Sequence, residues 1–433
     1  MTASLLVPGP SADTAARAPA AAGSAADETA LVAGLWVAIA LTVFEGPLRY
    51  GLNQVGADAA YFLRDLVMVV PLVVYVVRRL PVGAVPTSVS VFFALIAVHA
   101  AVAVLNLGTA VPAVYGLKLL LPVLCAWLVP QALWRVSPGL LRAVALMWLA
   151  TVAFAAIDQF REEQFRWVGA GVELGGIDVQ IGRDWQSGDV KRVAGLTRSS
   201  IHLANVLPLL SFVLLAALPS RALRAGVCAA TLAVLVWTTQ KGAILGFGLA
   251  VLAWAACTRE ALRPLKLALI ASLLLMLLAP TVLLQFDMPS DQGVFSMESF
   301  IERIERMWPE AWQWIGEYPA ALGVGLGGIG GAQRFYAPDR FNAADNLFVF
   351  LFANAGVMAL VYLLAATAAG LRTRLCEPQR DGAALAALVF LFAYGIVISL
   401  LEDPTAVILL GAALGALVRT RSDRPGAARE GAP

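Results

Sequence analysis

Basic side chains gather in the stretch DVKRVAGLTRSSIHLANVLP at 189–208, where an apolar run of helical length begins. They are Lys191, Arg192, Arg198 and His202. Hydroxyls and free backbone N–H groups at the start of a helix suit phosphate oxygens, and nearby cations strengthen such a site. We interpret the stretch as a candidate anion site. The alternative is that these are solvated loop charges or partners of lipid headgroups.

Two lysines lie close to other apolar runs. Lys241 is at the tight turn of VWTTQKGAILG, where it could join the anion site or extend to the membrane interface. Lys118 in YGLKLLLP lies about 9 Å along a predicted helix, at about 1.5 Å per residue. A charge inside a membrane helix usually faces the bundle interior and indicates a functional path.

Carboxylates occupy two further helix edges. Asp345 and Asn346 are adjacent in NAADNLFVFLFANAG, and Glu402 and Asp403 lie in SLLEDPTAV. A carboxylate and an amide can orient or deprotonate a hydroxyl, while cations stabilise the charge that develops on a departing diphosphate. The set suits a lipid-tailed substrate with a multiply charged phosphate, such as a sugar activated on a polyprenyl pyrophosphate. We expect neither a metal nor a cofactor.

The elements that must position these groups are membrane helices. Of 433 residues, 60% are hydrophobic and 14% charged, whereas soluble domains carry roughly 25% charged residues. Apolar runs long enough to cross a bilayer recur along the chain. The sequence therefore predicts an all-α polytopic membrane protein. The net charge of +2 gives no reason to expect nucleic acid as a partner.

Segmentation by apolar runs predicts about twelve transmembrane helices. They are expected at 29–46, 60–77, 88–106, 112–132, 138–158, 199–218, 224–239, 241–258, 264–285, 345–370, 382–401 and 404–419. Arginine and lysine follow every even-numbered run, so the positive-inside rule predicts that both termini are cytoplasmic. We expect a disordered tail at 1–28, one catalytic domain at 29–419 and a cytoplasmic tail at 420–433.

Two long loops then lie on the outer face, at 159–198 and 286–344. Loops of this length are usually functional. The second contains SMESFIERIERMWPEAWQWIGEYP, in which apolar residues recur at helical spacing and charged ones, among them Arg303 and Arg306, lie largely opposite. This pattern predicts an amphipathic helix. It could rest in the membrane interface with its tryptophans at headgroup depth, or form a lid on the bundle.

The glycine-rich segment GVGLGGIGG at 323–331 contains a GxGxxG match. No strand precedes it, and no strand–helix–strand unit surrounds it, so a dinucleotide site is not expected. We predict a flexible loop or one that a neighbouring element approaches closely.

Several motifs resemble the bacterial O-antigen ligases and Wzy-type polysaccharide polymerases. The ligases share a His followed by Asn, Ser or Gln, nine residues, a Gly, two residues and a small or polar residue. Here Asp345 replaces the His, followed by Asn346, nine residues, Gly356, two residues and Ala359.

Other segments extend the resemblance over roughly residues 40–415. KRVAGLTRSS is similar to an Arg-x-x-Gly segment, and TTQKGAILG to a Thr-x-Ser-Arg-Gly turn with Gln240 and Lys241 in place of Ser and Arg. WIGEYPAALGVGLGG resembles the stretch that precedes the ligases' His–Asn pair. FEGPLRY and YFLRDLVMV resemble polymerase-like members.

The resemblance implies an inverting, metal-independent glycosyl transfer from undecaprenyl pyrophosphate at the periplasmic face of the bacterial inner membrane. Arg192 and Lys241, with Lys118, would hold the diphosphate. Asp345 would act as the base or only orient the acceptor, beside Asn346. The further candidate substrate-binding residues are Arg198, His202, Arg303, Arg306 and Glu402.

Three functions stay open. The first is an O-antigen or exopolysaccharide polymerase, whose acceptor is another lipid-linked glycan. The second is an O-antigen ligase, whose acceptor is lipid A core. The third is a twelve-helix flippase for lipid-linked oligosaccharides, although the two halves show no clear internal repeat. The expected partners are the lipid-linked oligosaccharide, the acceptor glycan and the bilayer, with polysaccharide export and chain-length proteins as further candidates.

Overall fold

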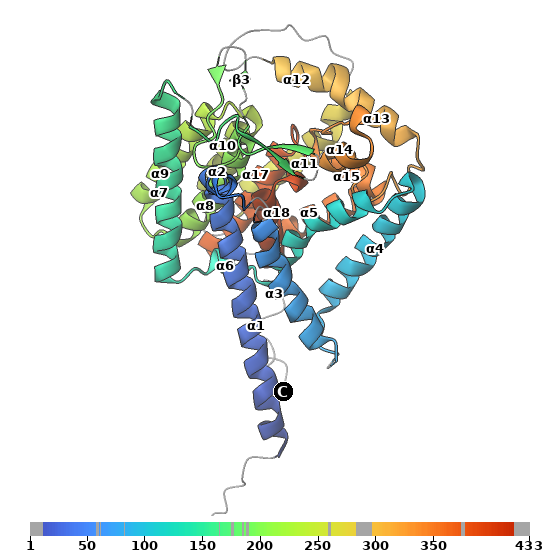
Figure 1. The fold of residues 1–433 in the computed structure, drawn as a ribbon. Helices are drawn as coiled ribbons and strands as arrows, with labels where there is room; N and C mark the ends of the chain where they lie inside the picture. Colours follow the sequence, from blue (N-terminus) through green and yellow to red (C-terminus); the bar gives the residue numbers. More distant parts are fainter. Residues whose placement is uncertain are drawn as a thin grey trace, which may run out of the picture.

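The computed structural model describes residues 12–57, 60, 62–81, 83–163, 165–174, 177–183, 186–187, 190–258, 261–282, 297–373 and 377–419. The chain folds as a helical bundle with a few short strands (Figure 1). The helices up to the first long loop are α1 (Ala12–Val43), α2 (Glu45–Gln54), α3 (Leu63–Arg79), α4 (Thr87–Leu107), α5 (Val111–Leu128), α6 (Gln131–Trp134) and α7 (Pro138–Phe160).

The later helices complete the bundle. They are α8 (Ser200–Ala217), α9 (Arg221–Trp237), α10 (Lys241–Ala255), α11 (Arg263–Val282), α12 (Glu298–Glu302), α13 (Trp308–Gly316), α14 (Gln333–Tyr336), α15 (Leu347–Ala355), α16 (Met358–Arg372), α17 (Pro378–Tyr394) and α18 (Pro404–Arg419). A π-helical turn, Arg303–Met307, joins α12 to α13, and 3₁₀ turns occupy Gly330–Ala332, Pro338–Arg340 and Leu400–Glu402.

Six of the described helices are long and apolar enough to cross a membrane, and further apolar helices are shorter. This agrees with a polytopic membrane protein. Each predicted run overlaps a helix, but the run at 345–370 is divided at Gly356 into α15 and α16. The predicted disordered tail differs as well, because α1 already begins at Ala12. Residues 1–11 and 420–433 lie outside the described part.

The bundle is organised around α8 and α17, which are buried along nearly their whole length. Helix α17 packs against α8, α10, α11 and α18, and α18 packs against α5. Because both central helices are apolar on every side, they can only be stable inside the bundle. The more exposed helices α3, α4 and α7 lie around them (Figure 1).

Polar loops collect at the two ends of the bundle. At one end Glu377 forms ion pairs with Arg135 and Arg380, and Lys266 Nζ donates to the carbonyl of Thr373 at 3.0 Å. The other end carries α12, α13 and the strands of the 159–198 loop, and α1 runs away from it toward the N-terminus (Figure 1). We call this second end the loop end.

The 159–198 loop contains two β-hairpins that the sequence patterns did not predict. Strand β1 (Gly171–Leu174) pairs antiparallel with β2 (Ile177–Gln180), and β3 (Gln186–Ser187) pairs with β4 (Val190–Lys191). The second predicted loop, 286–344, is described from residue 297 onward.

The predicted amphipathic helix is the continuous rod formed by α12, the π turn and α13. Its apolar face is buried through Ile304, Trp308 and Ile315. Trp312 Nε1 donates to the carbonyl of Pro280 at 3.3 Å, and Trp314 Nε1 to that of Gly328 at 2.8 Å. The rod therefore packs on the bundle as a lid, the second of the two arrangements considered above.

Candidate functional site

Three cations meet at the loop end and form what we call the first cation cluster: Arg192, Lys241 and Arg303. The positive charges of Arg192 and Arg303 both act on Lys241, and Arg303 also acts on Arg192. Burial lowers the pKa of the Arg192 guanidinium, and the charge of Arg303 lowers it further. Its Nε is buried without a hydrogen-bond partner in the described part of the chain. An anion bound here would relieve this repulsion.

Three separate segments bring these cations together. The segment after β4 carries Arg192 and is fixed to the end of α9, where Val193 N donates to the carbonyl of Trp237 at 3.1 Å. Lys241 is the first residue of α10. Arg303 lies in the π turn of the lid, and its Nε donates to the carbonyl of Val397 at 3.1 Å. The cluster therefore forms only in the folded bundle.

Asp345 pairs directly with this cluster. Its Oδ2 lies 2.7 Å from Nη2 of Arg303. Burial raises the pKa of the Asp345 carboxyl, and the charge of Arg303 partly offsets that rise. An exposed Asp would be too weak a base at neutral pH, so a buried environment makes the residue a better proton acceptor.

The side-chain oxygen and nitrogen of Asn346 both form hydrogen bonds within the protein. Its Oδ1 caps α15 by accepting from Val349 N at 3.0 Å, and its Nδ2 donates to the carbonyls of Met276 at 3.1 Å and Ile396 at 3.0 Å. The residue is completely buried. It fixes the start of α15 and thereby the place of Asp345, and its side chain leaves little capacity for a substrate.

Backbone strain is concentrated at this cluster. Within the described ranges, the non-glycine residues with positive φ are Thr239 at 57°, Ala344 at 60° and Asp345 at 37°. Thr239 precedes Lys241 by two residues, and the other two lie at Arg303. Such conformations are unfavourable for residues with a Cβ and tend to be kept at functional sites.

A second group of cations lies close by, and we call Arg183, Arg198 and Arg334 the second cation cluster. All three charges act on the hydroxyl of Tyr115. The chain links two of them, because Arg183 N donates to the carbonyl of Arg198 at 2.9 Å. Burial lowers the pKa of Arg198 to about 10, with a contribution from the nearby charge of Arg49.

The carboxylate of Glu402 interacts electrostatically with residues on both sides. Its charge interacts with Asp345 of the first site and with Arg334 of the second. Oε1 accepts from Gly331 N and Oε2 from the Ser399 hydroxyl. Burial raises the pKa of this carboxyl to about 7 despite those hydrogen bonds.

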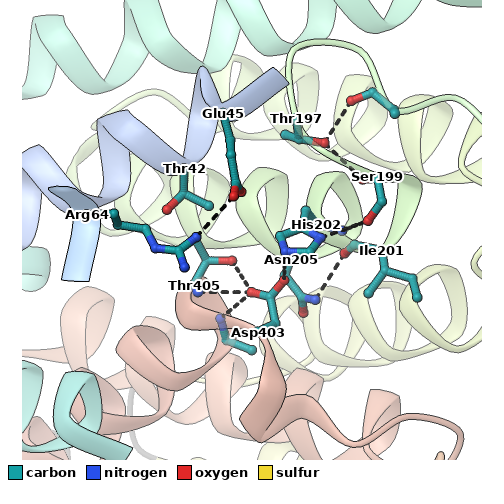
Figure 2. A network of polar contacts seen from close by, with 12 residues as sticks. Thr42, Glu45, Arg64, Thr197, Ser199, Ile201, His202, Asn205, Asp403 and Thr405 are labelled. Carbon is teal, nitrogen blue, oxygen red and sulfur yellow. Dashed lines mark hydrogen bonds and ion pairs between the residues drawn. The ribbon is translucent and has the colours of Figure 1, made fainter. Parts of the chain in front are cut away.

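His202 belongs to a buried polar network beside the second cluster (Figure 2). Its Nδ1 shares a hydrogen bond of 2.7 Å with the Ser199 hydroxyl, and its Nε2 lies 3.9 Å from Oδ2 of Asp403. On the other side of the network, Arg64 Nη1 lies 3.4 Å from Oε1 of Glu45 (Figure 2). This network ties α2, α3 and α8 to the start of α18.

Lys118 and Arg306 are candidate residues that take part neither in the two cation clusters nor in the hydrogen bonds of the His202 network. Lys118 Nζ forms an ion pair with Asp65 at 2.8 Å beside an open hollow between α3 and α5. Arg306 is exposed and pairs with Glu302 on its own helix.

The comparisons add one match. Residues 226–364 match the family described as O-antigen ligase. No curated protein and no solved structure matches the chain. The match covers about a third of the chain and supports its similarity to the O-antigen ligase and Wzy superfamily.

The matched segment includes part of each cation cluster. Lys241, Arg303 and Asp345 lie within it, as does Arg334 of the second cluster. Arg192 and Arg198 precede it and Glu402 follows it.

Several residues at the candidate site were not predicted from sequence. Tyr394 on α17 lies within reach of the charges of Arg192, Arg303 and Asp345, and its hydroxyl is 3.5 Å from Oε1 of Gln240. Arg183, Arg334 and Tyr115 were also missed. Each is a single polar residue in a loop or apolar run, with no local pattern to distinguish it.

Proposed function

We propose that the protein is a polysaccharide polymerase, which transfers a glycan from undecaprenyl pyrophosphate to a sugar hydroxyl of a second lipid-linked glycan. In this proposal the chain crosses the bacterial inner membrane about twelve times, both termini are cytoplasmic, and the loop end faces the periplasm. The reaction inverts the anomeric centre and needs no metal.

The observation that carries the proposal is the meeting of three cations and one buried carboxylate. Arg192 and Lys241 repel each other and Arg303, whereas Arg303 also holds Asp345 at 2.7 Å. A diphosphate bound by the cations would bring its sugar next to this carboxylate. A cation site beside a proton acceptor is what displacement of a diphosphate by a hydroxyl requires.

The chemical step balances with these groups alone. The acceptor hydroxyl oxygen attacks the anomeric carbon as the bond from that carbon to the diphosphate oxygen breaks. The hydroxyl proton passes to Asp345, and the electron pair of the broken bond stays on undecaprenyl pyrophosphate. Arg192, Lys241 and Arg303 stabilise that added charge, which lowers the barrier because they are already in position.

A polymerase is preferred to a ligase on two grounds. Asp345 replaces the histidine of the ligase pattern. The polymerase-like segments FEGPLRY and YFLRDLVMV are also joined at the loop end, where Glu45 pairs with Arg49 at 2.5 Å and with Arg64 at 3.4 Å. Because the matching family is described as O-antigen ligase, transfer to lipid A core is the second candidate.

Purified protein in nanodiscs, given lipid-linked repeat units from its own host, tests the proposal. We expect chain growth with release of undecaprenyl pyrophosphate. Transfer to added lipid A core instead would establish the ligase, and movement of substrate between leaflets without bond formation would establish a flippase.

Variants connect the activity to the site. Arg192→Ala and Asp345→Ala should each lower chain growth about 100-fold or more while expression is retained. The matched control is Arg340→Ala, an exposed loop-end arginine that pairs with Glu317. Full-length polymer from either site variant would remove that residue from the mechanism.

A further inference from the structure

Arg192 depends on other parts of the fold for its position. Its Nε forms no hydrogen bond within the described residues, and the charges of Lys241 and Arg303 repel its guanidinium. The residue follows β4 directly and lies in irregular backbone before α8, so neither a helix nor a strand ladder fixes it. Contacts of the neighbouring residues must therefore set the place of this arginine.

The buried carboxylate of Asp158 supplies those contacts from the end of α7. Its Oδ2 accepts from Ala194 N at 3.1 Å and from Gly195 N at 3.0 Å. On the other side of Arg192, Lys191 Nζ lies 2.7 Å from Oδ1 and also donates to the backbone carbonyl of Asp158 at 2.7 Å. One residue therefore holds the segment on both sides of the arginine.

Gly195 allows the segment to approach α7 this closely. The residue has φ +55°, and an added Cβ would lie 3.3 Å from Ala155 N. Successive backbone N–H groups in such a turn can form a concavity that binds an anion. Here the bound anion is the Asp158 carboxylate, which leaves the side chain of Arg192 available to a substrate. The contact also gives a physical reason for the Arg-x-x-Gly spacing of Arg192 and Gly195.

The stability of α7 alone does not explain why an aspartate stands at position 158. A carboxylate in the last turn of a helix is unfavourable, because the helix dipole places negative charge there. Asp158 is also only 2% exposed, and an ionised group is costly to bury unless it is paired and hydrogen-bonded. The contacts with residues 191–195 offset both costs. The aspartate is therefore placed to hold that segment.

We propose that Asp158 is a positioning residue, which holds Arg192 where it binds the donor diphosphate. It acts through the backbone of residues 194 and 195 and through Lys191, and it does not touch the substrate itself. The inference rests on the proposed function for the role of Arg192. It adds a residue outside the matched family segment, at the end of a different helix from any that carries the first cation cluster.

The affinity for undecaprenyl pyrophosphate tests the inference without requiring transfer. It can be measured by native mass spectrometry of the full chain in nanodiscs. Asp158→Asn keeps the size of the side chain, but its NH₂ group would face the Lys191 ammonium. We expect this variant to bind about tenfold or more weakly, because charge-assisted hydrogen bonds that fix the segment are lost. Lys191→Gln should have a similar effect and replaces a more exposed side chain.

The matched control is Glu163→Gln. Glu163 is an exposed carboxylate of the same loop, and its Oε2 lies 3.5 Å from Nη2 of Arg161. This variant should bind undecaprenyl pyrophosphate as the wild type does. Equal affinities of the wild type, Asp158→Asn and Lys191→Gln would overturn the inference.

A double variant separates positioning from a general effect on structure. If Asp158 acts through Arg192, Asp158→Asn should weaken binding little further in a protein that already carries Arg192→Ala. A purely structural role predicts the same loss of affinity in both backgrounds, and that result would overturn the inference. All the proteins are compared below their unfolding temperatures, so that loss of folded protein does not enter the measured affinity.

Transfer kinetics separate this inference from the proposed function. Asp158→Asn should raise the donor KM and leave the acceptor KM unchanged; an equal rise in both would contradict a role through Arg192. A wild type that binds undecaprenyl pyrophosphate without extending a chain refutes the polymerase, while the double variant still decides the role of Asp158. A wild type that does not bind this lipid refutes the donor site and the inference with it.

Discussion

Arg303 and Asp345 form an ion pair of 2.7 Å between the lid and the start of α15, and both side chains are largely buried. The pair joins the cations of the first cluster to the carboxylate that we propose as the proton acceptor. Removing one partner of such a pair leaves the other charge uncompensated.

The two residues should therefore act as a unit. We expect Asp345→Asn and Arg303→Gln each to lower the transfer rate about 100-fold or more. The double variant should be little worse than either single one, because the interaction is already lost. Transfer rates of the four proteins in nanodiscs measure this, and fully additive losses would show that the residues work independently.

Glu402 should make stability depend on pH. Burial raises its pKa to about 7 in the folded protein, above the ordinary value of 4.5. The folded state therefore binds the Glu402 proton more tightly than the unfolded state does. The stability that this protonation contributes is complete below pH 4.5 and is lost as the pH rises through 7. Between pH 5 and pH 8 the unfolding temperature of the wild type should fall relative to that of the Glu402→Gln variant. Parallel curves for the two proteins in detergent would contradict this.

Thr239 offers a test of stored strain. It has φ 57°, and its buried Oγ1 has no hydrogen-bond partner in the described part. Thr239→Gly should stabilise the protein by about 1 kcal/mol, since glycine adopts this conformation freely. Transfer should fall, because the turn that carries Lys241 becomes less restricted. The unfolding temperature and the transfer rate measure the two effects, and a lower unfolding temperature would show that the conformation is not strained.

The glycine-rich segment should tolerate no side chain at Gly327. This residue has φ +76°, and an added Cβ would lie 2.0 Å from the Pro112 carbonyl oxygen. Gly327→Ala should destabilise the protein by about 2–5 kcal/mol, from backbone strain and overpacking. Gly226→Ala in α9 is the control, because nothing lies within 4 Å of its Cβ and alanine favours a helix. Equal thermal unfolding of the two variants would contradict the close approach.

The helices were predictable because each apolar run carries its own signal of length and hydropathy. The hairpins of the 159–198 loop were not, since their strands are only two to four residues long and lack a regular alternation. The closely approached loop at 323–331 was predicted as one alternative and is confirmed by the contact of Gly327 with Pro112.

The site residues that could be predicted are those that lie next to the ends of predicted helices. Arg192, Lys241 and Asp345 were predicted to converge, and their charges do meet around Arg303. The second cluster could not be predicted, because Arg183 and Arg334 are 151 positions apart in the sequence. Only the fold brings their charges together. Their catalytic and binding roles stay predictions.

The break at Gly356 has a consequence for how the protein matures in the bilayer. The glycine-rich loop is seated against it, with Val324 N bonded to the Ala353 carbonyl at 2.8 Å. Leu326 N donates to the carbonyl of His99, which is eight residues, or about 12 Å, from the end of α4. Irregular backbone at such depth is stable only where surrounding protein satisfies its polar groups. We therefore expect the loop to dock after α4, α5 and the α15–α16 pair have assembled, so that this part of the bundle is completed late.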